Sequence, residues 1–350
     1  METIIAQITE NEEQNQKIYE QASDILKRGG LVAFPTETVY GLGADALDEE
    51  ASAKIYAAKG RPSDNPLIVH IADTKALEEL SCDVTAQAKL LAEKFWPGPL
   101  TMILKKSDCV PKSITGGLGT VAIRMPSHPA AQKLIEYSGG YIAAPSANTS
   151  GKPSPTVAKY VVEDMMGRID AIIDGGEVGI GLESTIIDLT VSPPQILRPG
   201  YITREKLSTV LGTVDTDATI LRADSGQAPK APGMKYRHYA PRGELTIVEG
   251  TPEQVREYIN REAAADHAAG EKTGIIGTEE MLSGYTADVV KSVGSRRDED
   301  SIARHLYTIL REFDDEGVTK IYSEGFPTDG FGQAIMNRLL KAAGHKVVKL

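Results

Sequence analysis

Short apolar runs recur along the chain, and the segments between them alternate between amphipathic helical patterns and tight turns. Clear examples of such runs are residues 31–34, 67–72, 120–125 and 141–145. Some of the runs are joined by helical stretches, whereas others are joined by turns such as Ser192-Pro193-Pro194. This mixed spacing predicts an α/β domain built on a twisted, mixed β-sheet.

The alternation lapses once and then resumes, which predicts two domains. We expect an α/β domain over residues 1–213 and a smaller, doubly wound, Rossmann-like α/β domain over residues 244–350. Residues 214–243 have no clear period and are rich in Asp, Ala, Gly and Pro, as in an extended connector. Because a passive tether has no need of Tyr236 and His238 so close together, we expect part of this linker to contact the site.

The composition limits the kinds of partner. A formal net charge of -11 disfavours wholesale nucleic-acid binding, although a local basic groove stays possible. The two cysteines are too few for a disulfide framework or a zinc cluster and fit a reducing compartment. The start of the chain lacks a signal-peptide pattern, and no run approaches the roughly 18 apolar residues of a membrane span. We therefore expect a cytoplasmic protein that does not bind membranes.

A polar turn and two cations indicate a small anionic ligand. The turn, residues 35–41, is dense in hydroxyl groups and glycine, and Lys59 and Arg61 follow at the end of the next helix. Cations at a helix C-terminus also stabilise the macrodipole, by a few tenths to about 1 kcal/mol. Ser146 and Asn148 follow an apolar strand and could complete the hydrogen bonding of a phosphate chain, but a simple Asx-type turn explains them equally well.

Four further polar residues have two readings each. Arg124 and Arg198 each end an apolar strand, where an arginine is either a surface residue or a planar fork for a carboxylate or phosphate. His70 lies within an apolar strand, either as a buried, hydrogen-bonded residue or as a ligand contact. Ser184 follows a Gly-rich loop and either starts a strand or points into a pocket. The residues alone leave these alternatives open.

Several common catalytic motifs do not fit. Gly41-Leu42-Gly43 begins a permissive dinucleotide pattern, but it lies well past the end of the preceding strand, so we interpret it as a turn. Gly151-Lys152 is followed by Pro153 and lacks the upstream glycine of a P-loop. No Gly-x-Ser-x-Gly elbow occurs, and the six histidines do not cluster. These observations favour chemistry by positioning and electrostatics, as in phosphoryl or nucleotidyl transfer.

Six ordered motifs carry a resemblance to a known family. They are FPTETVYGL at 34–42, KGRP at 59–62, NPL at 65–67, WPGPLT at 96–101, RMP at 124–126 and APSAN at 144–148. Together they resemble the YrdC-like family of L-threonylcarbamoyl-AMP synthases, closely so over residues 21–204. The motif PGMKYRHYAP at 232–241 and the trailing α/β domain resemble the long, two-domain branch, although Ala231 stands where many long members have serine.

The resemblance implies a nucleotidyltransferase with an open, cationic cavity. The reaction joins L-threonine, bicarbonate and ATP to give threonylcarbamoyl-AMP and pyrophosphate. A downstream tRNA threonylcarbamoyl-transferase complex then moves the threonylcarbamoyl group to an adenosine of certain tRNAs. Mg²⁺ is expected as the cofactor, bound with ATP through its phosphates and water, because the sequence offers no dedicated protein cage for it.

The resemblance also assigns residues. As catalytic residues it implies Lys59, Arg61, Ser146 and Asn148. The L-threonine subsite comprises Thr38, His70, Arg124, Ala144 and Ser184, with Arg124 pairing with the substrate carboxylate. The ATP subsite comprises Lys59, Arg61, Asn65, Thr120, Ser146, Asn148, Ser154, Arg198, Tyr236 and His238.

The main alternative is an RNA-binding module that holds a phosphodiester backbone in the same cavity. The acidic net charge and an aromatic content of only 5% disfavour it, because single-stranded RNA is commonly bound by stacking on aromatic side chains. We therefore expect no stable binding of nucleic acid.

Overall fold

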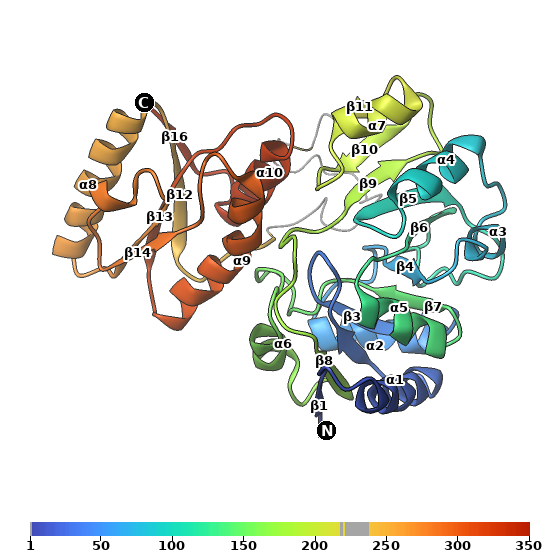
Figure 1. Ribbon diagram of the computed structural model, residues 1–350. Helices are drawn as coiled ribbons and strands as arrows, with labels where there is room; N and C mark the ends of the chain where they lie inside the picture. Colours follow the sequence, from blue (N-terminus) through green and yellow to red (C-terminus); the bar gives the residue numbers. More distant parts are fainter. Residues whose placement is uncertain (1, 218–219, 221–237) are drawn as a thin grey trace.

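The residues that the structure describes form two β-sheets, each in its own lobe, so the predicted α/β fold class is confirmed (Figure 1). The computed structural model describes residues 2–217, 220 and 238–350. We call the lobe with the 11-stranded sheet the N-terminal domain and the lobe with the 5-stranded sheet the C-terminal domain. The boundaries at 213 and 244 stay predictions.

The N-terminal sheet is mixed, with the strand order β1-β8-β2-β3-β7-β4-β6-β5-β9-β10-β11. Its strands are β1 (Ile4–Gln7), β2 (Val32–Phe34), β3 (Gly41–Asp45), β4 (Ile68–Ile71), β5 (Leu100–Lys105), β6 (Thr120–Arg124), β7 (Tyr141–Ala144), β8 (Ala171–Asp174), β9 (Thr185–Asp188), β10 (Gln195–Arg198) and β11 (Asp215–Thr216). Strand β4 is parallel to β6 but antiparallel to β7. The predicted mixture of parallel and antiparallel pairing is thus confirmed.

The helices of this domain are α1 (Glu12–Lys27), α2 (Glu49–Lys59), α3 (Ala76–Leu80), α4 (Ala86–Phe95), α5 (Pro129–Tyr137), α6 (Ala158–Met165) and α7 (Arg204–Leu211). Helix α2 shows how local sequence positions the site. The side chain of Asp48 caps its first turn, and Gly60 ends it in the left-handed conformation, with φ 61°. Lys59 is therefore the last helical residue, and its side chain is buried.

The segment that begins at Gly41 is strand β3, so its interpretation as a turn was wrong. The strand pairs antiparallel with β2. A Cβ atom on Gly43 would lie 2.8 Å from Cγ2 of Ile142 and 2.9 Å from Cε1 of Phe34. Position 43 requires glycine because those two side chains leave no room for a Cβ atom. The glycine pattern that resembles a ligand-binding motif in the sequence is therefore explained here by packing.

The C-terminal sheet is entirely parallel, with the order β14-β13-β15-β12-β16. Its elements are β12 (Glu244–Glu249), α8 (Pro252–Ala268), β13 (Thr273–Gly277), the 3₁₀ helix η1 (Leu282–Gly284), β14 (Val289–Ser292), α9 (Glu299–Asp315), β15 (Lys320–Glu324), α10 (Gly332–Ala342) and β16 (Val347–Lys349). A capping box between Thr251 and Gln254 starts α8. Helices α9 and α10 lie on the side that faces the N-terminal domain, and α8 lies on the other side (Figure 1).

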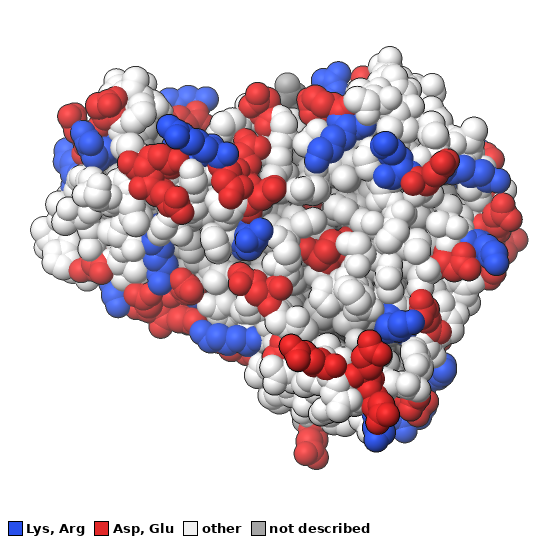
Figure 2. Space-filling view, in the orientation of Figure 1, with Lys and Arg blue, Asp and Glu red and all other residues white. Residues whose placement is uncertain are grey.

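Acidic and basic side chains alternate on the face drawn in Figure 2, and no continuous basic stripe crosses the part of that face which the structure describes. Within the described ranges, no helix is long and apolar enough to cross a membrane.

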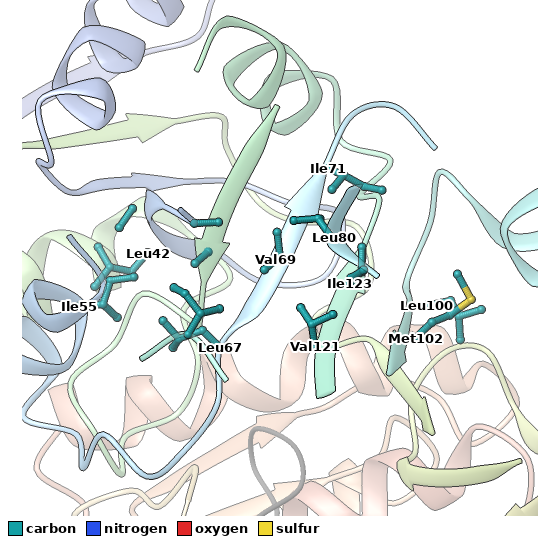
Figure 3. Packing of buried hydrophobic residues seen from close by; sticks show 14 of the residues in the cluster. Leu42, Ile55, Leu67, Val69, Ile71, Leu80, Leu100, Met102, Val121 and Ile123 are labelled. Atoms are coloured by element: carbon teal, nitrogen blue, oxygen red, sulfur yellow. The ribbon is translucent and has the colours of Figure 1, made fainter. Parts of the chain in front are cut away.

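The N-terminal core packs against the sheet beside the site. Leu42 of β3, Val69 of β4 and Ile123 of β6 belong to one buried cluster, together with Ile55 of α2 (Figure 3). Each of these four side chains is completely buried. Burying an aliphatic side chain of this size contributes about 1.5–3 kcal/mol. The strands and the helix that carry the site residues are therefore rigidly held.

Candidate active site

A recess of about 710 Å³, part of it open to solvent, lies where several strands of the N-terminal sheet end. The lining residues are Thr36, Val39, Tyr40, Gly41, Lys59, Arg61, Ile68, His70, Arg124, Ala144, Pro145, Ser146, Asn148, Ser150, Gly151, Lys152, Ser154, Glu183, Arg198, His238 and Tyr239. Ten of the residues predicted from sequence are among them: Lys59, Arg61, His70, Arg124, Ala144, Ser146, Asn148, Ser154, Arg198 and His238.

Basic side chains dominate this lining. It includes the cations Lys59, Arg61, Arg124, Lys152 and Arg198. The side chains of Lys59, Arg124 and Arg198 are all more than nine-tenths buried. Buried cations repel one another and are poorly solvated, so an anion that entered the recess would be strongly favoured.

Lys59 connects the end of α2 to the loop after β7. Its Nζ atom donates to the carbonyl oxygens of Ser146, at 2.5 Å, and Asn148, at 2.6 Å. Burial, reinforced by the neighbouring Arg61, lowers the pKa of Lys59 well below its ordinary value. A bound anion would oppose this effect and favour the charged lysine.

The loop with Ser146 and Asn148 has internal hydrogen bonds and also faces the recess. The Oγ atom of Ser146 donates to Oδ1 of Asn148 at 2.6 Å. The side-chain amide of Asn148 donates to the carbonyl oxygens of Thr149 and Lys152, at 2.8 and 3.0 Å. These hydrogen bonds shape the loop even without a ligand, but in none of them does the Asn148 side chain accept from a backbone N–H group, as it would in an Asx turn, and both residues line the recess.

Arg124 is a buried cation with unused donors. Its Nη2 atom lies 2.8 Å from Oε1 of Glu37 in an ion pair. Neither Nε nor Nη2 of Arg124 has a hydrogen-bond partner within the described residues. Burial of unsatisfied donors costs about 1–3 kcal/mol for each group. A planar carboxylate is the ligand that would satisfy this fork best.

His70 lies directly beside Arg124 and is neutral. Its Nδ1 atom is 3.1 Å from the carbonyl oxygen of Ile68, so this nitrogen carries the ring proton. Burial, and then the charge of Arg124, lower the pKa of His70 to about 3. The interpretation as a buried, hydrogen-bonded residue is confirmed, whereas the ligand contact stays a prediction for a residue that lines the recess.

Ser184 and Thr38 lie behind the lining. The Oγ atom of Ser184 is 2.7 Å from Oγ1 of Thr101 and accepts a hydrogen bond from Nη2 of Arg198 at 3.1 Å. Oγ1 of Thr38 is 2.9 Å from Oγ1 of Thr36. Both predicted residues are completely buried and are absent from the lining, so they contact the recess through their neighbours.

The remaining predicted residues are spread more widely. Asn65 is buried, and its carbonyl oxygen accepts a hydrogen bond from Arg61 at 3.3 Å. Thr120 is half-buried at the start of β6, and neither it nor Asn65 is part of the lining. Tyr236 lies outside the described residues. His238 lines the recess, and burial, followed by the charge of Arg61, lowers its pKa to about 4.

Eleven lining residues were not assigned to the site from the sequence, among them the polar residues Lys152, Glu183 and Tyr239. Glu183 precedes Ser184, and Tyr239 follows His238, so proximity to assigned positions was a usable signal. Partners of Glu183 come from the C-terminal domain, more than 120 residues away in sequence.

The donor set of the recess suits phosphate and carboxylate groups. It combines five cations with residues that carry hydroxyl groups, such as Ser146 and Ser154. Among the residues described by the structure, no group of three or more His, Cys, Asp or Glu side chains is arranged to hold a metal ion. A fold with two α/β lobes and such a recess defines a protein that binds an anionic small molecule.

Comparison with known proteins identifies the family. Residues 24–200 match the family model Sua5_yciO_yrdC, described as "Telomere recombination". Residues 202–344 match the model Sua5_C, described as "Threonylcarbamoyl-AMP synthase, C-terminal domain". The chain therefore belongs to the Sua5 family of threonylcarbamoyl-AMP synthases, and the resemblance found in its motifs is confirmed.

Relatives resemble the chain over nearly its whole length. A threonylcarbamoyl-AMP synthase of Pyrococcus abyssi is 52% identical and covers 94% of this chain and 95% of its own. That of Bacillus subtilis is 51% identical, with 94% of each chain covered. The crystal structure of P. abyssi Sua5 complexed with L-threonine has a TM-score of 0.93 at 48% identity and covers 100% of both chains. E. coli YciO matches 57% of this chain and 95% of its own, with a TM-score of 0.50 at 27% identity.

Proposed function

We propose that this protein is an L-threonylcarbamoyladenylate synthase, which forms threonylcarbamoyl-AMP and pyrophosphate from L-threonine, bicarbonate and ATP. Its family membership and its similarity to named synthases at about half identity over nearly the whole chain carry this conclusion. The buried basic recess is the observation in the structure that fits it best, because two of the three substrates carry carboxylate or phosphate groups.

The reaction needs two bond-forming steps. The neutral amine of threonine attacks the carbon of bicarbonate, and a carbamate forms with loss of water. An oxygen of the carbamate then attacks the α-phosphorus of ATP in line, and pyrophosphate leaves. Carbamates are short-lived in water, so a recess whose polar walls are largely buried favours the second step over hydrolysis.

Arg124 is proposed to bind the carboxylate of threonine. Its Nε donor, which has no hydrogen-bond partner within the described residues, and its burial support this role, while Nη2 is already paired with Glu37. The neutral His70 beside it provides a polar wall without adding a further charge. Ala144, which ends β7, lines the same part of the recess and leaves room for the amino acid. Thr38 and Ser184 are proposed to support this subsite from behind the lining.

Lys59 and Arg61 are proposed to bind the phosphates of ATP, together with Arg198. The hydroxyl groups of Ser146 and Ser154 border the same space. Asn65 and Thr120 are proposed to act near the nucleotide from the flanking loop and strand, and Asn148 through the loop that it shapes. Charges preorganised in a water-poor site stabilise the developing negative charge of the transition state more than they would in water.

Mg²⁺ is proposed to enter with ATP. The recess offers hydroxyl, amide and cationic groups and only one carboxylate among its described lining residues, Glu183, which is already occupied by other partners. This set fits a magnesium ion that is held by phosphate oxygens and water. When bound, the ion would supply charge neutralisation on the triphosphate.

Two broader statements complete the proposal. The product is expected to pass to a tRNA threonylcarbamoyl-transferase complex, because its mixed anhydride is an activated form of the threonylcarbamoyl group. We also propose a cytoplasmic location, where threonine, ATP and tRNA are available.

The decisive experiment measures pyrophosphate released by the full chain with ATP, Mg²⁺, L-threonine and bicarbonate, omitting each in turn. We expect release to require both threonine and bicarbonate. Release that continues without threonine would identify the protein as an ATP pyrophosphohydrolase instead.

The RNA-binding alternative is not favoured. The net charge is -11, and the face shown in Figure 2 has interspersed charges on its described part. RNA retention on filters that is tight, strongly salt-dependent and unaffected by ATP would nonetheless restore it.

A further inference from the structure

We infer that the C-terminal domain completes the nucleotide subsite, with Arg338 and Tyr307 acting as positioning residues for Glu183 and, through it, for Ser154. This inference rests on the proposed function, because Ser154 and Glu183 line the recess to which we assign ATP. Neither Arg338 nor Tyr307 is part of the lining, so neither is proposed to touch a substrate.

Glu183 is the point where the two domains meet the recess. The Nε atom of Arg338, on α10, lies 3.0 Å from Oε2 of Glu183. The hydroxyl group of Tyr307, on α9, is 3.2 and 3.0 Å from the two carboxylate oxygens. On the other side, Oγ of Ser154 donates to Oε1 at 2.6 Å. One carboxylate of the N-terminal domain thus connects a lining hydroxyl group to two helices of the C-terminal domain.

Arg338 is held in one orientation. Its side chain is completely buried, and its Nη1 atom donates to the carbonyl oxygen of Pro199 at 2.8 Å and to Oδ1 of Asn337 at 3.1 Å. Pro199 directly follows Arg198 of the recess. The guanidinium group of Arg338 therefore contacts both the carboxylate of Glu183 and the backbone that follows Arg198, two residues that line the recess.

A second contact anchors the loop that carries Ser154. Arg311, on α9, donates from Nε and Nη2 to the carbonyl oxygen of Pro153 at 3.1 and 2.7 Å. Its Nη1 and Nη2 atoms also bind the two carboxylate oxygens of Asp164, at 3.1 and 2.7 Å. The loop is thus held on both sides of Ser154, by Arg311 at Pro153 and by Glu183 at the serine hydroxyl group.

The positive charge of Arg338 is expected to favour ATP binding, in addition to the hydrogen bonds that Arg338 makes. Among the lining residues in the described ranges, Glu183 carries the one carboxylate, and a triphosphate would be repelled by it. Arg338 neutralises this charge from behind the wall. The rings of Tyr307 and Tyr239 stack with centroids 5.1 Å apart. Helix α9, which carries Tyr307, therefore also supports the described end of the connector.

The test compares ATP affinity in variants of the full chain by calorimetry with Mg²⁺ and ATP. We expect Arg338→Met to weaken ATP binding by about 10-fold or more, because the buried carboxylate loses its counter-ion and Ser154 its support. Arg338→Lys should recover part of the affinity, since it restores the cation. L-threonine affinity should stay within about threefold of wild type, because the lining residue that Glu183 binds, Ser154, belongs to the proposed ATP subsite.

Arg296→Met is the matched control. Like Arg338, Arg296 pairs with a buried carboxylate, here that of Glu324 in the C-terminal domain. Glu324 does not line the recess, whereas Glu183 does. We expect it to lower stability while leaving ATP affinity at the wild-type level. Equal ATP affinity in wild type and Arg338→Met overturns the inference, and so does an equal loss in Arg296→Met and Arg338→Met.

Tyr307→Phe provides a milder variant if Arg338→Met does not fold. It removes the hydroxyl contact to Glu183 and keeps the ring that stacks on Tyr239. Weaker ATP binding supports the inference, whereas wild-type affinity in both Tyr307→Phe and Arg338→Lys overturns it. A wild-type protein that binds ATP but releases no threonine-dependent pyrophosphate would overturn the proposed function alone, because the ATP comparison does not depend on turnover.

Discussion

Buried arginines occur in two regions of this protein, and their surroundings differ. In the recess, Nε of Arg61 and Nε and Nη2 of Arg124 have no hydrogen-bond partner within the described residues. At the interface between the domains, Arg311 and Arg338 each make several hydrogen bonds to carboxylate and carbonyl oxygens. The recess thus has unsatisfied donors beside contacts that are already formed, such as the ion pair of Arg124 with Glu37 and the hydrogen bonds of Arg198 to Ser184, whereas the donors of the interface arginines are satisfied by the protein itself.

The interface arginines should therefore affect stability most. Arg311→Leu leaves the carboxylate of Asp164, which has no exposed surface, without its bidentate partner. We expect the free energy of unfolding to fall by about 3–5 kcal/mol, measured by urea denaturation. A loss below about 1 kcal/mol would mean that Lys152 and the backbone N–H of Thr149, which also bind Asp164, compensate for the missing arginine.

The buried carboxylate at the interface should make stability depend on acid. Burial alone would raise the pKa of Glu183, but Arg338 and Arg198 together lower it from 4.5 to about 2. Because the folded-state pKa is the lower one, the contribution, on the order of 3 kcal/mol, is present above about pH 4.5 and is lost as the pH falls toward 2.

Glu183→Gln tests this pH dependence. The difference in unfolding free energy between wild type and variant should be constant above about pH 6 and should shrink below about pH 4.5. A difference that stays unchanged from pH 6 down to pH 3 would contradict the assignment of this acid sensitivity to Glu183.

Arg124, one of the arginines that line the recess, should affect catalysis more than stability. Arg124→Ala is expected to lower kcat/KM for L-threonine on the order of 10-fold to 100-fold or more, because a charge-assisted hydrogen bond contributes about 1.5–3 kcal/mol. ATP affinity should change little. Arg124→Lys is the control, since it keeps the charge but loses the planar fork, and we expect an intermediate value. Wild-type kinetics in Arg124→Ala would refute the carboxylate role.

The smallest effect is expected from the exposed ion pair at the same interface. Lys159 lies 2.6 Å from Asp315, and the two side chains are 60% and 37% exposed. Lys159→Ala should lower the free energy of unfolding by about 0–1 kcal/mol, because solvent and salt screen such pairs. A loss as large as that of Arg311→Leu would show that burial does not explain the difference between the two interface contacts.

Much of the secondary structure could be predicted because local sequence specifies it. Asp48 and Gly60 mark the ends of α2, and Thr251 with Gln254 marks the start of α8. Strand β3 was missed because glycine is common in turns, and only the neighbouring side chains of Phe34 and Ile142 explain why Gly43 lies in a strand.

The candidate site was predicted in part, and chiefly through its motifs. Lys59, Arg124 and Ser146 were assigned from the resemblance, and the structure brings their side chains to one recess. Composition and spacing alone had left each of them with a structural alternative. Their assigned roles stay predictions.

The sequence by itself determined most of the strands and helices, the capping of the helices and the motifs of the family, because these depend on residues that are close together along the chain. The tertiary structure alone decided which charges meet. Glu183 and Arg338 are 155 positions apart, and Asp164 and Arg311 are 147 apart. No local pattern specifies such pairs, since they form only when two separately built sheets pack their helices and loops against each other and exclude water between them.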